Sequence, residues 1–359
     1  MADRQRSLEP GGRGMPAVRQ SSKAAIGFSL LVTTLLLTNS AHADDRGGNG
    51  DKDSAGPSGS KHNDTISATA GVQYDLTKNG TGTGAGPVTP VSDWTPPACW
   101  YAPKYTPEDA ARTWMGYDRS PNHTGSDTVE SFKDRYIKGH PYTNFNLDKQ
   151  GKGYWWDEYT DDSRSGDLSA ADCTDPPFWV DTGAPPPHVK NAVTPEILAR
   201  LAYAQIRIPQ GKAATNPDGT LIVNVPTWVW LDKATFHPVS VRAYVSVLGI
   251  EATTTATPVG LHIDPGTQDA DLFPASGDCP IDAKGNVGTP YVKGDTGAPP
   301  CGVTYLRSTQ NIAPYQLKAT VTWKISWTGT GRPTPVALPD GTFGTPQDAY
   351  VREYQTVNR

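Results

Sequence analysis

The sequence predicts a mainly β protein: an antiparallel, immunoglobulin-like sandwich of two sheets, preceded by an aromatic-rich irregular region with short helices. Two segments alternate between apolar and polar residues, as strands with one buried face do. They are residues 239–247 (VSVRAYVSV) and 321–327 (VTWKISW). About six further strand-length segments, separated by turns rich in Gly, Pro and Asp, have no long helix between them, which favours a sandwich.

The N-terminal part of the chain predicts export. Residues 23–43 (KAAIGFSLLVTTLLLTNSAHA) combine a basic start, an apolar run of 14 residues and a small-x-small end. The run is too short for an ordinary membrane span, and the pattern is typical of a signal peptide that is cleaved after Ala43. We therefore expect residues 1–43 to be a signal peptide. The mature chain would have no membrane span and would be secreted, or held at the cell wall by its own binding.

Residues 44–92 follow this leader and are rich in Gly, Ser, Asp and Thr. They contain too little apolar surface to offset the entropy of an ordered chain, so we predict a flexible tether, with at most a short strand near Ile66–Tyr74. Without residues 1–43 the chain has 27 basic and 35 acidic residues, a net charge of −8. This balance argues against a nucleic-acid partner.

The four cysteines, Cys99, Cys173, Cys279 and Cys301, all lie beyond the leader. An even number in an oxidising compartment predicts two disulfides, for which three pairings are possible. Proximity in sequence favours Cys99–Cys173 and Cys279–Cys301. The chain has no C-x-x-C motif, so redox catalysis and a cysteine zinc site are not expected.

Residues 93–192 form the aromatic-rich region. Thr106-Pro107-Glu108-Asp109 is a helix start, with Thr as N-cap and acids beside the positive end of the helix dipole. A second helix is predicted over residues 127–138, where four apolar residues share one face. Loops and short strands are expected between this helix and residue 192.

Residues 193–359 form the predicted sandwich domain. Thr194-Pro195-Glu196 repeats the capping pattern and opens one helix. Strands are predicted at 220–225, 227–232, 250–257, 259–264, 302–307 and 349–357, besides the two alternating segments. Asp218-Gly219 and Asp340-Gly341 are predicted turns. Trp323 and Trp327 lie on the apolar face of their segment and are predicted core residues. Trp228 and Trp230 lie on a strand that is apolar on both faces. We expect the aromatic-rich region to pack against one of these faces.

The most informative candidates for binding are aromatic. Trp155, Trp156 and Tyr159 are flanked by acids and glycines in the segment GYWWDEYTDD. Exposed rings of this kind stack on sugars or on a protein partner. The alternative is that these rings close over the sandwich and belong to its core.

The acids of the same segment suggest two further kinds of site. Asp157, Asp161 and Asp162, together with Glu158, offer carboxylate oxygens of the kind that bind Ca²⁺, although they lack the EF-hand spacing. The alternative is a solvated acidic loop. Asp157 and Glu158 also lie beside tryptophans, as a pair of carboxylates in a glycoside hydrolase would.

Other motifs give weaker signals. Gly80, Gly82 and Ala85 match G-x-G-x-x-[G/A], but Pro87 and Pro90 follow, so no helix can begin there to bind a pyrophosphate. The chain has no P-loop and no G-x-S-x-G nucleophile motif. His262 and Asp264 share one strand face and would bind a metal if a third ligand joined them. The alternative is a solvent-facing strand end.

Four stretches resemble a family of uncharacterised exported actinomycete proteins: WTPPACWYAPKYTPE, FWVDTGAPPP with TPEILARLAYAQI, PTWVWL, and CGVTYLRS with TVTWKISWTGTG. The resemblance covers roughly residues 93–359. It implies export and an aromatic-rich module joined to a β-sandwich. Such proteins often carry the labels "ATP/GTP-binding protein" or "enoyl reductase". No motif of this sequence supports either label, and the resemblance implies no catalytic residues.

These observations predict a secreted or surface-associated protein that acts as a non-enzymatic interaction module. The ligand class that they favour is a polysaccharide or another cell-wall component, and no cofactor is expected unless Ca²⁺ binds. One alternative is an extracellular hydrolase whose acids converge only in the fold. Another is a structural component of the cell envelope.

Overall fold

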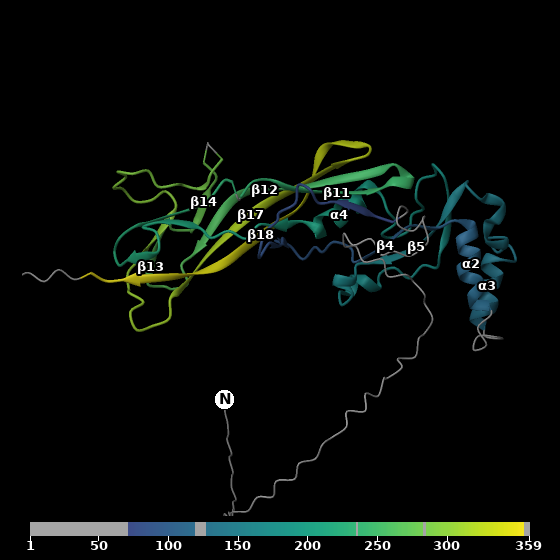
Figure 1. The fold of residues 1–359 in the computed structure, drawn as a ribbon, viewed down its shortest axis with the longest axis horizontal. Coiled ribbons are helices and arrows are strands. Elements are labelled where there is room, and N and C mark those ends of the chain that lie inside the picture. The colour runs from purple at the N-terminus through teal and green to yellow at the C-terminus, as the bar shows by residue number, and fades with distance from the viewer. Residues whose placement is uncertain (1–70, 119–126, 235, 283–284, 355–359) are drawn as a thin grey trace, which may run out of the picture. The chain divides into compact units, whose positions relative to one another are not determined.

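A computed structural model of the chain describes residues 71–118, 127–234, 236–282 and 285–354. The predicted signal peptide and the tether up to residue 70 lie outside these residues. The described chain is mainly β, with several antiparallel sheets and few short helices, as the sequence predicts (Figure 1). Both predicted disulfides are present, Cys99–Cys173 and Cys279–Cys301. None of the described helices has the length and apolar character needed to cross a membrane.

The largest sheet has eight strands and is antiparallel except at β9. Its path runs β1-β11-β12-β17-β18-β3, with β14 paired to β12 and β9 paired to β18. The bounds are β1 (Gln73–Asp75), β3 (Thr89–Pro90), β9 (Thr220–Ile222), β11 (Val239–Val245), β12 (Ile250–Asp264), β14 (Asp278–Pro280), β17 (Tyr315–Gly329) and β18 (Arg332–Arg352). Residues 239–245 of the first alternating segment form β11 and the second segment lies in β17, and their apolar residues are buried, Trp323 and Trp327 among them. The first segment ends earlier than predicted, because Val247 lies in a short 3₁₀ turn and is only partly buried.

A five-stranded sheet packs against one end of the inner face of this sheet, which gives a sandwich-like arrangement. It contains β8 (Ala214–Asn216), β10 (Thr227–Leu231), β13 (Ala270–Phe273), β15 (Val287–Gly288) and β16 (Gly302–Tyr305). Val229 and Val303 of this sheet share one hydrophobic core with Leu261 and Val321 of the larger sheet. The immunoglobulin-like character of the sandwich stays a prediction.

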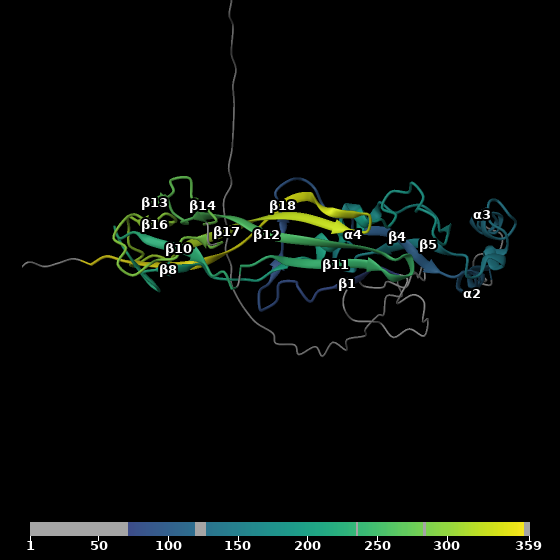
Figure 2. The same cartoon turned by 90° about the horizontal axis from the view of Figure 1, so that it is seen from above.

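A helix covers another part of the inner face, and a third sheet joins the same core. α4 (Pro195–Gln205) contacts β11, β12 and β17, and Figures 1 and 2 both place it beside β11 and β12. Thr194 caps it as predicted, since its Oγ1 accepts a hydrogen bond from the N–H of Ile197 (3.2 Å). Trp100 and Tyr101 of the third sheet belong to the same core as α4, so the aromatic region and the sandwich form one packed unit.

The third sheet carries the helical part of the aromatic region. It is formed by β4 (Cys99–Tyr105), β5 (Gly153–Thr160) and β6 (Phe178–Asp181). Between β4 and β5 lie α2 (Pro107–Asp118), α3 (Asp127–Tyr136) and the 3₁₀ segment η1 (Asn144–Lys149). These elements enclose a second, smaller core around Trp114 and Trp155. Short 3₁₀ segments follow at η2 (Asp162–Arg164), η3 (Leu168–Ala171) and η4 (Ser246–Leu248).

The end of the predicted tether differs from expectation. Residues 73–90 form β1, β2 (Gly86–Pro87) and β3, which pair with β11, β7 (Arg207–Ile208) and β18. Buried Val88 joins the main core, so the ordered chain begins before residue 93. The matched glycines Gly80 and Gly82 lie in the connection between β1 and β2, and no helix follows them.

Two predicted strand boundaries are also wrong. Residues 250–264 form one strand, in which a register shift between Pro258 and Gly260 replaces the expected break. Asp340-Gly341 is no turn but the middle of β18, where Gly341 pairs with Trp323 and Pro90. A Cβ at residue 341 would collide with the side chain of Val88. Glycine is therefore needed there for the close approach of β3.

Candidate functional site

The face of the eight-stranded sheet that points away from the core has a regular composition. In β12 and β17, residues alternate between buried and partly exposed positions. Outward residues pair across the strands, as in Thr253 with Thr328 and Thr255 with Ser326. We call thirteen polar or aromatic outward side chains the open face: Ser240, Arg242, Tyr244, Thr253, Thr255, Thr257, His262, Thr320, Thr322, Lys324, Ser326, Thr328 and Thr342. Eight of them carry a threonine or serine hydroxyl within β12, β17 and β18. Apolar side chains lie among them, such as Val259, which is 41% exposed, and Ala337 opposite Ser326.

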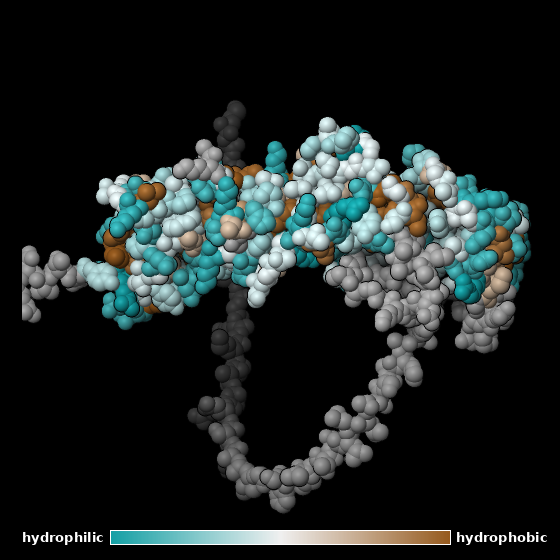
Figure 3. Space-filling view, turned by 45° about the horizontal axis from the view of Figure 1, so that its top comes forward, coloured by the Kyte–Doolittle hydropathy of each residue, from teal (hydrophilic) through white to brown (hydrophobic). Residues whose placement is uncertain are grey.

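Apolar side chains do not dominate the side of the molecule that Figure 3 shows. In the view of Figure 3, hydrophilic and near-neutral side chains cover most of the visible side, and apolar ones form small separate patches. Single apolar residues of this kind are ordinary on a protein surface. The open face therefore offers hydrogen-bonding groups, because hydroxyl side chains both donate and accept hydrogen bonds.

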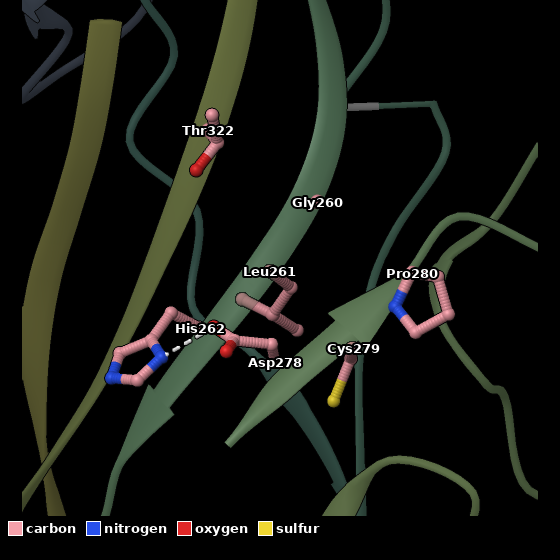
Figure 4. Close-up of a pocket in the computed structure, with 7 residues that line it drawn as sticks. All are labelled: Gly260, Leu261, His262, Asp278, Cys279, Pro280 and Thr322. Atoms are coloured by element: carbon pink, nitrogen blue, oxygen red, sulfur yellow. Dashed lines mark hydrogen bonds and ion pairs between the residues drawn. The ribbon is translucent and has the colours of Figure 1, made fainter. Parts of the chain in front are cut away.

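A shallow depression of about 220 Å³ lies at one end of the open face, where β12, β14 and β17 meet (Figure 4). Thr322 lies across from Gly260 in the neighbouring strand, and Pro280 of β14 lies on the other side of Gly260. A Cβ at residue 260 would meet one atom within 4 Å, the carbonyl oxygen of Cys279 at 3.9 Å. The glycine thus leaves room in the depression rather than relieving a clash.

His262 and Asp278 form the charged part of the depression. They are direct partners across β12 and β14, and the imidazole Nδ1 lies 2.7 Å from Asp278 Oδ1. The hydrogen bond from His262 lowers the pKa of the Asp278 carboxyl, and a hydrogen bond with Ser276 contributes in the same direction. The carboxylate thus accepts a hydrogen bond from Nδ1–H, which leaves Nε2 of a neutral imidazole as an acceptor.

The core below the depression fixes this pair. Leu261 and Cys279, next to His262 and Asp278 in the two strands, are paired with each other and buried. Cys279 is bonded to Cys301, which precedes β16 of the other sheet. The disulfide therefore ties β14 to the other sheet, while the pairing of β14 with β12 keeps His262 and Asp278 opposite each other.

The sequence did not indicate the partner of His262. The expected partner was Asp264, whose Oδ1 instead accepts a hydrogen bond from the N–H of Gly266 in the turn (2.9 Å). Asp278 is 16 residues away from His262, and only the register of β14 on β12 brings them together. Within the described residues, no three His, Cys, Asp or Glu side chains are grouped as metal ligands, so the third ligand that a metal site would need is not found there.

The predicted aromatic platform is wrong. Trp155, Trp156 and Tyr159 are 0%, 1% and 6% exposed. Trp155 packs among the rings of the second core and donates its indole N–H to the carbonyl of Phe145 (3.1 Å). Trp156 and Tyr159 belong to the main core. The reason is that β5 is the central strand of its sheet and is covered on both faces, so these rings close the structure and cannot stack on a ligand.

The three predicted Ca²⁺ ligands do not come together in one site. Asp161 caps the segment η2 and accepts hydrogen bonds from the N–H (3.0 Å) and hydroxyl (2.6 Å) of Ser163. Asp162 is exposed. Asp157 instead faces a buried lysine, Lys104, with 3.9 Å between Oδ2 and Nζ. The described residues thus provide no calcium site formed by Asp157, Asp161 and Asp162.

Lys104 was not singled out from the sequence, although its strand carries a signal. The segment CWYAPKY has one charged residue among apolar and aromatic ones, and all but its last residue are buried. A lysine is almost never buried without a partner.

Comparisons with protein-family models, with curated proteins and with solved structures gave no match.

Proposed function

We propose that the chain is an exported, non-enzymatic interaction protein that binds a cell-wall polysaccharide through the open face. The observation that carries this proposal is the covering of the eight-stranded sheet. Its inner face is buried under α4 and the five-stranded sheet, while the described residues leave hydroxyl-rich rows of the other face at the surface. The resemblance to exported actinomycete proteins and the two disulfides support the extracellular part of the proposal.

The chemistry of the open face favours a glycan over an apolar partner. Rows such as Thr255 with Ser326 and Thr322 with Thr342 present donors and acceptors at the regular spacing of paired strands. The depression beside Thr322 adds an oriented imidazole and a carboxylate. Sugar hydroxyls are bound by groups of this kind. Tyr244, with the Arg242 guanidinium 4.5 Å from its ring centroid, provides an aromatic surface on the same face.

The test is retention of the purified chain on insoluble polysaccharides and on cell walls, at moderate salt. The variant Thr255→Glu/Thr322→Glu places two carboxylates on the open face and should lose most of the retention. The matched control is Thr296→Glu, because Thr296 is an exposed threonine outside the strands. Equal retention of both variants, with unchanged thermal unfolding, would contradict binding through this face.

A second candidate, an extracellular hydrolase, is favoured by the His262–Asp278 pair. A carboxylate that orients an imidazole is a common general-base arrangement. The experiment that separates the two functions is an assay for released reducing sugar on the retaining matrix. His262→Ala should leave release at the background level of a non-enzymatic binder if the first proposal holds. Release by the parent chain that is abolished in His262→Ala would favour the hydrolase.

A structural envelope role is the third candidate, and the burial of the tryptophans favours it. Trp155, Trp156 and Trp323 are all fully buried and contribute to the stability of the cores. Such a protein would show no retention on any matrix. It would instead co-fractionate with the envelope of the producing cell.

A further inference from the structure

Lys104 and Asp157 form a buried pair at the base of the helical part of the aromatic region. Lys104 lies in β4 where the register of β4 on β5 shifts, between Pro103 and Tyr105. The register shift directs its side chain inward, and the side chain is 6% exposed, against 18% for that of Asp157. Bulges of this kind are found where a strand re-aims a side chain for a specific purpose.

The lysine amine has contacts besides Asp157. Nζ donates a hydrogen bond to the carbonyl of Glu158 (2.9 Å) and lies 4.9 Å from the centroid of the Tyr159 ring. The carboxylate of Asp157 is 3.9 Å away, whereas a charge-assisted hydrogen bond is about 2.8 Å long. The two groups face each other without a close ion pair.

Burial of these two charges is costly. Taking an ammonium and a carboxylate out of water costs several kcal/mol per ion unless the pair is closely hydrogen-bonded. Burial raises the pKa of the Asp157 carboxyl, although the Lys104 charge and the N–H of Glu158 act against this shift. A lysine amine and a carboxyl that the fold holds opposite each other place a nucleophile and an electrophile in one site.

We propose that Lys104 and Asp157 form an intramolecular isopeptide bond. A proton passes from the Lys104 ammonium to the Asp157 carboxylate, Nζ attacks Cγ, a C–N bond forms and the C–OH bond breaks. One hydrogen of the amine leaves with the hydroxyl as water, and the other stays on the amide nitrogen. No oxidant or cofactor takes part, and the neutral amide that results removes two charges from the interior.

The position of the bond explains what it would do. It joins β4 to β5 and so closes the excursion that contains α2, α3 and η1, together with the second core. The Cys99–Cys173 disulfide encloses the same excursion with a sequence separation of 74. An amide, unlike a disulfide, is not broken by reductants. The helical part would thus stay attached to the third sheet under reducing conditions.

The test is the mass of the purified full chain after reduction and alkylation. The expected mass is lower than the sequence mass by one water molecule. Because an Asp-Gly sequence also loses water when it forms a succinimide, tryptic peptides are needed as a second readout. The expected product is a branched peptide that joins residues 79–112 to residues 153–164, since trypsin does not cut after an acylated Lys104.

Two variants and one control complete the design. Lys104→Arg and Asp157→Ala should both restore the full mass and abolish the branched peptide. Lys138→Arg is the control, because Lys138 forms an exposed ion pair with Glu130 (2.9 Å) and should leave the water loss unchanged. A parent chain of full mass, or a water loss without the branched peptide, would overturn the proposal. The mass and the peptides of the parent chain decide the matter, whether or not the variants fold.

Discussion

Strands β5 and β12 both carry residues that suggest a site in the sequence, yet only β12 presents them to solvent. β5 is the central strand of its sheet, and its tryptophans at 155 and 156 point into two different cores. β12 is covered on one face only, so His262 and its neighbouring threonines stay at the surface. The difference teaches that an aromatic-acidic motif indicates a binding site only where the fold leaves one strand face uncovered.

The largest effect expected from this comparison concerns Trp155. Replacement by alanine removes a ring that contacts Trp114 and Tyr142, with centroid distances of 5.2 and 4.7 Å, and leaves a cavity. We expect a loss of about 3–5 kcal/mol in the free energy of unfolding, measured by urea denaturation. Leu168→Ala, at a side chain that is 95% exposed, should change it by less than about 0.5 kcal/mol. A stable Trp155→Ala protein with altered binding would reverse the assignment of β5.

The next effect separates the disulfides of the two regions. Cys99–Cys173 spans 74 residues and Cys279–Cys301 spans 22. Since loop-closure entropy grows with loop length, the double serine variant of the first pair should lose more stability, about 4 kcal/mol against about 3 for the second. Unfolding in urea, with the other disulfide kept intact, measures both. A larger loss at Cys279–Cys301 would show that tying β14 to the five-stranded sheet outweighs chain entropy.

Much of the open-face strand pattern could be predicted from the sequence, because strict alternation in β11 and β17 specifies which residues are inside. Helix starts at Thr106 and Thr194 and the disulfide pairing were also confirmed. The burial of β5 could not be predicted, because it depends on which elements cover each face. Nor could the His262–Asp278 pair, which depends on the register of a three-residue strand.

The residues around Gly341 show why β18 was only partly predicted. Prolines at 333, 335, 339 and 346 and the Asp340-Gly341 pair all argue against a strand. In the described residues β3 pairs with β18 only at Gly341 and Thr342, so the stretch from 332 to 339 has a free edge that tolerates proline. A strand of this kind is defined by its position in the sheet and not by its composition.

A smaller effect is expected at Gly341 itself. Gly341→Ala would push β3 away from the sheet, because the new methyl group collides with Val88. The cost should be about 1–3 kcal/mol. Gly297→Ala is the matched control, because nothing lies within 4 Å of a Cβ there, and thermal unfolding should not change. An unaffected Gly341→Ala protein would show that residues 73–90 contribute little to the folded unit.

The smallest effect concerns the charge of Asp278. The pKa of this carboxyl is lowered in the folded chain, chiefly by the hydrogen bond with His262. Its stabilising contribution is therefore present above the ordinary value of 3.8 and is lost as the pH falls through the folded-state pKa. Asp278→Asn should be slightly less stable than the parent chain at neutral pH and equal to it in strong acid. A stability difference that is constant over this range would contradict the pairing.

The most direct measurement is retention on cell-wall polysaccharide of three proteins side by side: the parent chain, Thr255→Glu/Thr322→Glu and Thr296→Glu. Thermal unfolding of all three is measured beside retention, because Thr255 and Thr322 are partly exposed and Thr296 is exposed. The account predicts that the parent chain and the loop control are retained, and that the open-face variant is not. Retention of all three, or of none, would contradict polysaccharide binding through the open face.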